Sequence, residues 1–155
     1  MAVTALLVGF VGPIGRADDR EAQFVAEIQK LTPELQTVAA GGRWFRGSTF
    51  GTFRLLVRQL GFEFQRDYAF LQWIRLADDA TNADVIERTV PITEVHGIIT
   101  SHRFAGAAKA WKLVLRSEWL DHASDPPQKR HAYFVITPSA DYTYTCREYA
   151  REPDI

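Results

Sequence analysis

The chain has 155 residues, a length that fits a single domain with a substantial buried core. A hydrophobic fraction of 46% and an aromatic fraction of 12% exclude disorder as the overall state, and a net charge of −1 argues against a large nucleic-acid footprint. The single cysteine, Cys146, excludes a disulfide framework within the chain and fits either a reducing or an oxidising compartment.

An uninterrupted apolar or neutral run, AVTALLVGFVG, occupies residues 2–12. It is shorter than the roughly 20 residues of a transmembrane helix, so we expect no membrane span. The run suits a secretory signal, with Gly15 and Ala17 as the small residues before a cleavage site. No Lys or Arg precedes it, which leaves a retained N-terminal strand as the alternative. The interpretation is a signal peptide over residues 1–17 and a secreted or periplasmic protein; retention of the segment would place the protein in the cytoplasm.

A helical segment is predicted after residue 17, where Asp18 suits a helix N-cap. An amphipathic stripe at the i, i+4 and i+7 spacing follows: Phe24, Ile28 and Leu31. Thr32-Pro33 interrupts this helix, and Leu35 and Val38 continue an apolar face until Gly41-Gly42 ends it. One bent helix and two short helices are both consistent with this pattern.

Residues 50–76 predict a β-hairpin at the centre of an antiparallel sheet. In its first half, apolar residues alternate with Arg54 and Arg58, which is typical of a half-buried strand. A turn at residues 60–67 separates this half from a second strand that is apolar on both faces. We therefore expect the second strand to be central and buried.

Further strands are predicted over residues 85–95, 98–104, 111–116, 132–137 and 142–147. Pro91 confines the first of these to a sheet edge, a bulge or an interruption, and Asp125-Pro126-Pro127 marks a loop over residues 121–130. The links are short and contain no helix, which favours an antiparallel meander over parallel βαβ units. The predicted fold class is α+β, with the N-terminal helical segment packed on a curved antiparallel β-meander of about six to eight strands. We assign residues 18–155 to one globular domain, whose meander either curves around the helix or closes into a barrel.

Metal and catalytic chemistry has weak support in the sequence. Glu94, His96 and His102 have the residue types of a zinc site, but their spacing matches no ligand signature. Candidate catalytic groups are Asp121-His122 with Ser117 or Ser124, the thiol of Cys146, and the carboxylate pairs Glu87/Glu94 and Glu118/Asp121. No G-x-S-x-G elbow or glycine-rich phosphate loop accompanies them, so we predict a non-enzymatic protein without a cofactor or metal.

A basic and aromatic cluster gives the strongest sign of a binding surface: Arg43, Trp44, Phe45, Arg46, Arg54 and Arg58. Tryptophan and arginine are enriched among the residues that anchor protein interfaces. The alternative for the same residues is a solvated sheet face on which arginine stems cover apolar surface. The net charge near zero and the lack of an RNA-binding motif argue against nucleic acid.

The sequence thus predicts an exported, non-enzymatic module that binds a protein partner, in the manner of an inhibitor, immunity or accessory protein. Two alternatives stay open. One is a small enzyme with its site in the concavity of the sheet. The other is a carrier of an apolar small molecule, with a barrel-like pocket lined by Phe62, Phe64, Phe70, Trp73 and Trp111.

Overall fold

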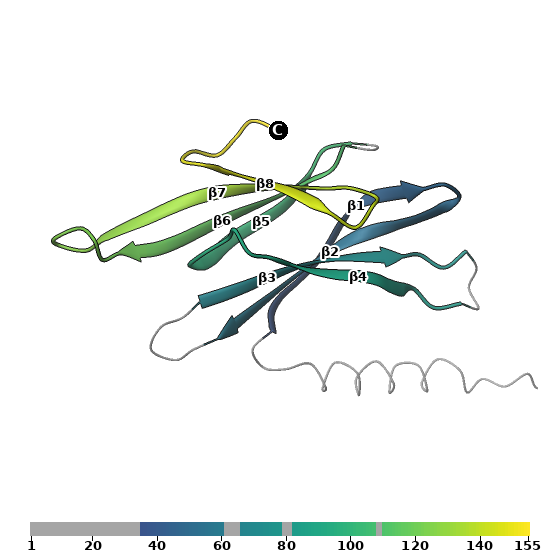
Figure 1. The fold of residues 1–155 in the computed structure, drawn as a ribbon, viewed down its shortest axis with the longest axis horizontal. Helices are drawn as coiled ribbons and strands as arrows, with labels where there is room; N and C mark the ends of the chain where they lie inside the picture. Colours follow the sequence, from purple (N-terminus) through teal and green to yellow (C-terminus); the bar gives the residue numbers. More distant parts are fainter. Residues whose placement is uncertain (1–34, 61–65, 79–81, 108–109) are drawn as a thin grey trace, which may run out of the picture. The chain divides into compact units, whose positions relative to one another are not determined.

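The computed structural model describes residues 35–60, 66–78, 82–107 and 110–155. In these ranges the chain forms eight strands, each antiparallel to its neighbours, and no helix (Figure 1). The predicted α+β class is therefore wrong, because the described part is all-β. The helix expected after residue 17 and the predicted signal peptide lie outside the described residues. The same ranges contain no helix long and apolar enough to cross a membrane.

The first sheet is a meander, since its strands are neighbours in both sequence and space. It contains β1 (Leu35–Arg46), β2 (Thr49–Leu60), β3 (Arg66–Arg75) and β4 (Val85–Ile92), in that order. The second sheet repeats the arrangement with β5 (Ile98–Ala105), β6 (Lys112–Asp121), β7 (Gln128–Pro138) and β8 (Tyr144–Tyr149). The predicted meander is thus present as two consecutive sheets, and neither a single barrel nor a sheet curved around a helix is formed by the described strands.

The hairpin predicted over residues 50–76 is confirmed as β2 and β3. Phe53 stands opposite Trp73, and Leu55 stands opposite Leu71. Strand β3 lies between β2 and β4, which confirms its predicted central position. Strand β4 is an edge of its sheet, in agreement with Pro91, because proline cannot donate a ladder hydrogen bond.

Strand β1 corrects the prediction of a helix that includes Leu35 and Val38. Val38 pairs with Leu56 and Ala39 with Leu55 in the ladder between β1 and β2. The spacing of the two apolar residues fits a short helix, but the backbone of β2 offers this segment a full set of pairing partners. Tertiary pairing therefore overrides local propensity here.

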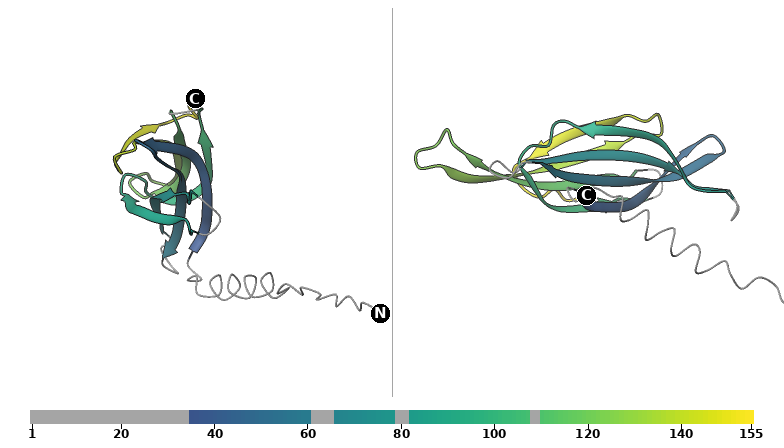
Figure 2. Two further views of the ribbon diagram at one scale, coloured as in Figure 1. Left: turned by 90° about the vertical axis from the view of Figure 1, so that its right-hand side faces the viewer. Right: turned by 90° about the horizontal axis from the view of Figure 1, so that it is seen from below.

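The core lies between the two sheets and is built from alternate residues of the central strands. Its largest fully buried side chains are at most 1% exposed to solvent: Leu55, Leu71, Trp73, Leu113, Leu115, Phe134 and Ile136. They belong to β2, β3, β6 and β7, so both sheets contribute to one core. The described part is therefore a β-sandwich, in which the two sheets pack face to face around this core (Figure 2).

Buried hydrogen bonds anchor the segment that connects β4 to β5, residues 93–97, and the first residues of β5. The Asp67 amide donates to the carbonyl of Gly97 at 3.1 Å, and the Asp67 carboxylate accepts from the amide of Ile99 at 2.7 Å. The Ser117 hydroxyl donates to the carbonyl of His96. These contacts hold the start of the second sheet against β3 of the first, and Asp67 is only 2% exposed.

Candidate functional site

A bulge near the end of β1 determines which side chains of the predicted cluster point inward. Gly41 pairs with Phe53 and Trp44 pairs with Gly51, so β1 advances three positions while β2 advances two. The intervening Gly42 has a φ of +71°, a left-handed conformation that glycine adopts without a Cβ penalty. The extra residue reverses the alternation of the strand, and Trp44 therefore enters the core.

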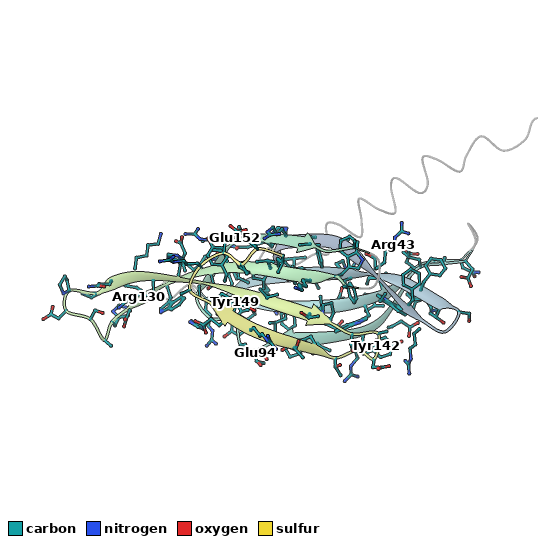
Figure 3. All side chains as sticks on the ribbon, turned by 90° about the horizontal axis from the view of Figure 1, so that it is seen from above. Arg43, Glu94, Arg130, Tyr142, Tyr149 and Glu152 are labelled. Atoms are coloured by element: carbon teal, nitrogen blue, oxygen red, sulfur yellow. The ribbon has the colours of Figure 1, made fainter. Side chains whose placement is uncertain are left out.

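Beside this bulge lies a cleft of about 200 Å³, which we call the aromatic–arginine cleft. Its lining residues are Arg43, Trp44, Phe45, Phe53, Trp111, Pro138, Ser139 and Ala140. They come from β1, β2, the residue just before β6, the last residue of β7 and the turn that follows it, so segments of both sheets form its walls. A wider hollow of about 450 Å³ adjoins it and shares Arg43, Phe45 and Trp111. Figure 3 shows Arg43 and Tyr142 toward one end of the sandwich and Arg130 toward the other.

The cleft rests on a rigid group of aromatic rings. The rings of Trp44 and Trp73 each meet Tyr142 edge-on at 6.1 Å, and Phe53 meets Trp73 at 5.9 Å. The indole N–H of Trp73 donates to the carbonyl of Ser139 at 2.8 Å, and that of Trp44 donates to the carbonyl of Thr52 at 3.2 Å. Because these rings are packed and hydrogen-bonded, they position the exposed rim with little freedom.

The rim of the cleft presents an arginine, an exposed phenyl ring and an indole. Arg43 is exposed, and Phe45 is 46% exposed. Trp111 packs over Gly42, where an added Cβ would lie 3.0 Å from its ring. The indole nitrogen of Trp111 is buried and has no hydrogen-bond partner among the described residues. The cleft therefore combines aromatic rings with the guanidinium of Arg43, which can only donate hydrogen bonds, while the indole nitrogen of Trp111 is not exposed at its surface.

The structure separates the six residues of the predicted cluster into three groups. Arg43, Trp44 and Phe45 line the cleft. The guanidinium of Arg46 lies 5.1 Å from the centre of the Tyr142 ring, and its Nε is 3.9 Å from the exposed carboxylate of Asp141. Such an exposed pair contributes little to stability.

Arg54 and Arg58 form the third group, on the outer face of β2. The side chains between them, Leu55 and Val57, are buried, which confirms that the two arginines share one face. Arg54 donates from Nε to Gln72 at 2.7 Å, and Gln72 donates to Thr89 at 2.9 Å. This row of side-chain hydrogen bonds across β2, β3 and β4 holds the Arg54 side chain against the outer face of the sheet.

Sequence reasoning missed Phe53, Trp111 and the turn at residues 138–140 as parts of the cleft. Their contribution depends on contacts between strands that are distant in the chain. The Gly41-Gly42 pair was the one available signal in the sequence. Glycines inside a strand often mark a bulge or a close approach, whereas the helical interpretation makes this pair the end of a helix.

The residues considered for zinc have other partners. Glu94 accepts a hydrogen bond from the Tyr144 hydroxyl at 2.8 Å, while the His96 ring packs edge-on against Trp119 at 4.3 Å. His102 is exposed on β5. Within the described ranges, no three His, Cys, Asp or Glu side chains are grouped so that they could hold a metal ion.

The serines considered for catalysis are placed apart. Ser117 is fully buried and donates to a backbone carbonyl, so its hydroxyl is not accessible to a substrate. Ser124 lies in the loop after β6 and contacts the Asp121 carboxylate at 3.3 Å. Asp121 also accepts from the amide of Ala123, a contact that lowers the pKa of its carboxyl group.

The Cys146 thiol and the Glu118 carboxyl, both considered for catalysis, have pKa shifts in the unfavourable direction. Burial, with help from Glu94 and Glu148, raises the pKa of the half-buried Cys146 thiol to about 11. A thiol with this pKa is protonated at neutral pH and is a poor nucleophile. A hydrogen bond from Lys129 lowers the pKa of Glu118, whereas a general acid needs a raised pKa.

Among the described residues, the aromatic side chains considered for a carrier pocket do not face a common space. Trp73 is fully buried in the core, and Phe70 lies on the opposite face of β3. Trp111 lies at the cleft, and residues 62 and 64 are outside the described ranges.

Comparisons with protein families, with curated proteins and with solved structures found no match to this chain.

Proposed function

We propose that the protein is a non-enzymatic module that binds another protein through the aromatic–arginine cleft. The observation that carries this proposal is the exposure of Phe45 and Arg43 beside a cleft of about 200 Å³ whose aromatic lining is held in place by packing and hydrogen bonds. Exposed aromatic and arginine side chains beside a cleft are the usual anchors of protein interfaces.

The chemistry of the cleft favours an extended peptide segment of the partner. Its lining combines aromatic side chains with polar groups, among them the exposed guanidinium of Arg43, which can only donate hydrogen bonds. A segment with an acidic side chain or free backbone carbonyls supplies the matching acceptors, while an apolar side chain occupies a cleft of about 200 Å³. Binding would act sterically, as in an inhibitor or an immunity protein, since no bond is made or broken.

Capture and titration test this proposal. The full chain is immobilised, a cell-envelope extract is passed over it at several salt concentrations, and a recovered protein is then purified and titrated. We expect Phe45→Ala to weaken binding roughly 30-fold, equivalent to about 2 kcal/mol for an interface anchor. Stability measured by urea unfolding should change little, because Phe45 is 46% exposed.

Leu120→Ala is the matched control, because Leu120 is 50% exposed but lies at the end of β6, outside the cleft. We expect its affinity to equal that of the unmodified protein. Failure to recover any stoichiometric partner, or equal affinity of Phe45→Ala and Leu120→Ala, would contradict the cleft as the binding site.

Export is part of the same proposal and depends on residues 1–17 alone, which lie outside the described ranges. N-terminal sequencing of protein from its native source tests it. A mature chain that begins at Asp18 would support export, and an intact Met1 would contradict it.

A further inference from the structure

We infer that β1 is the surface through which two copies of this chain associate, edge to edge, in an antiparallel pair. Strand β1 is the first strand of its sheet and pairs with β2 on one side only. Every second residue of such an edge strand directs its N–H and C=O groups away from the sheet. Within the described ranges, no backbone hydrogen bond joins these groups of β1 to another part of the chain.

The other edges carry features that prevent strand addition. Strand β4 contains Glu87, Arg88 and Pro91; β5 contains His102 and Arg103; β8 has six residues, including Arg147 and Glu148. Charges, prolines and short length are the devices that protect sheet edges. Residues 35–42 of β1, LQTVAAGG, contain neither a charge nor a proline. Arg43 and Arg46 lie beyond this stretch, so residues 35–42 form the longest run without a charge or a proline on any edge strand among the described strands, and a second strand can approach them without meeting either.

The part of β1 available for pairing is set by its two register shifts. One lies between Leu35 and Thr37, and the other between Gly41 and Trp44. Residues 37–41 between them, TVAAG, form a regular ladder with β2. A strand that pairs with its own copy has a two-fold axis at its centre, which places Ala39 opposite the Ala39 of the second copy.

The same register places Val38 opposite Ala40 of the second copy, twice per interface. Val38 is 52% exposed and Ala40 is also exposed in the single chain, so both gain burial on pairing. Small and apolar side chains meet without like charges in contact. The occupant that fits this edge is thus a second copy of the chain, because the segment is complementary to itself.

Charge substitutions at Val38 and Ala40 test the pairing in the full chain. We expect the unmodified protein to sediment as a dimer and Val38→Glu/Ala40→Glu to sediment as a monomer, because the glutamate introduced at position 38 would face the one introduced at position 40 of the second copy. Val38→Lys/Ala40→Lys should also be monomeric. An equimolar mixture of the two variants should restore the dimer, since opposite charges would then face each other.

Ile86→Glu is the control, because Ile86 is 51% exposed but lies on edge strand β4, and it should remain a dimer. A monomeric unmodified protein, a dimeric double-glutamate variant, or a mixture that stays monomeric would each overturn the inference.

Disulfide trapping gives a second measurement that does not depend on charge. In a Cys146→Ser background, mixed Val38→Cys and Ala40→Cys chains should cross-link on oxidation, since residues directly opposite have Cα atoms about 4.5–5.5 Å apart. Each variant alone should not, because its two cysteines would be offset diagonally by roughly 7–8 Å. Cross-linking of either variant alone, or none in the mixture, would show that the predicted pairing is wrong.

Discussion

A buried carboxyl group, Asp67, holds the junction between the two sheets. Its side chain is 2% exposed, one oxygen accepts from the amide of Ile99, and the other has no partner among the described residues. Desolvation raises the pKa of this carboxyl, because the charged form is costly where water is excluded. The amide of Ile99 and the side chain of Gln59 lower the pKa, but both effects are smaller than that of desolvation.

This raised pKa predicts a pH dependence of stability. The folded protein binds the Asp67 proton more tightly than the unfolded chain does, so the free energy of unfolding falls as pH rises from about 4 through the raised pKa. Asp67→Asn keeps an oxygen acceptor for Ile99 but does not titrate. In urea unfolding from pH 4 to neutral pH, we expect the unmodified protein to lose stability relative to Asp67→Asn. A difference that is independent of pH would exclude Asp67 as the titrating group.

Residue positions were predictable from the sequence only where strand alternation is regular. Alternation correctly places Arg54 and Arg58 on one face of β2, because the residues between them are buried. It fails for Trp44, since the extra residue at the Gly42 bulge reverses inside and outside. The sequence also could not bring Trp111 to Gly42, because that contact joins the two sheets.

Close approach of β2 to β1 and β3 depends on Gly51. A Cβ at this position would lie 2.0 Å from the carbonyl oxygen of Ile74 and 2.6 Å from the indole of Trp44. Neither neighbour is the end of a flexible side chain. The glycine is therefore required by packing between strands.

Gly51→Ala should lower the free energy of unfolding by about 1–3 kcal/mol or more, the usual cost of overpacking. Urea unfolding with the denaturant slope unchanged is the measurement. Ser48→Ala, in the exposed turn between β1 and β2, is the control and should stay within about 0.5 kcal/mol. An alanine that stabilises position 51, as it does at open strand glycines, would contradict the close packing.

Period-2 patterns predicted most of the strands correctly, but they did not predict β1, which was expected to be helical. Ala39 and Ala40 favour helix over strand, and Leu35 and Val38 have a spacing that both structures allow. The deciding contribution is the ladder with β2, whose pairing residues, 53–57, lie in a separate segment of the chain. A single segment does not encode its partner, so the all-β class could not be derived from local patterns.

Tyr144 connects β8 with the end of β4 in the other sheet. Its hydroxyl lies 2.8 Å from a carboxylate oxygen of Glu94 and 3.0 Å from the carbonyl of Pro91. The amide of Thr93 approaches the same hydroxyl at 3.4 Å. This contact joins the two sheets at the side of the sandwich formed by their last strands.

Tyr144→Phe should lower the free energy of unfolding by about 1 kcal/mol, the typical net value of one hydrogen bond. Thermal and urea unfolding of the variant measure the effect. Tyr149→Phe is the matched control, because Tyr149 lies on the same strand and is 37% exposed. Equal stabilities of the two variants would show that the hydroxyl of Tyr144 does not hold the sheets together.

The succession of two meanders has a consequence for how the chain reaches its native state. Each strand of the described part pairs only with strands adjacent in sequence, so every hairpin closes a short loop. Sandwiches with Greek-key connections must instead bring distant strands together before pairing, which slows folding. Here both sheets can form from local contacts, and the long-range step is their docking across the link fastened by Asp67. The rate of that docking, rather than of strand pairing, should determine how long apolar sheet faces stay exposed during folding.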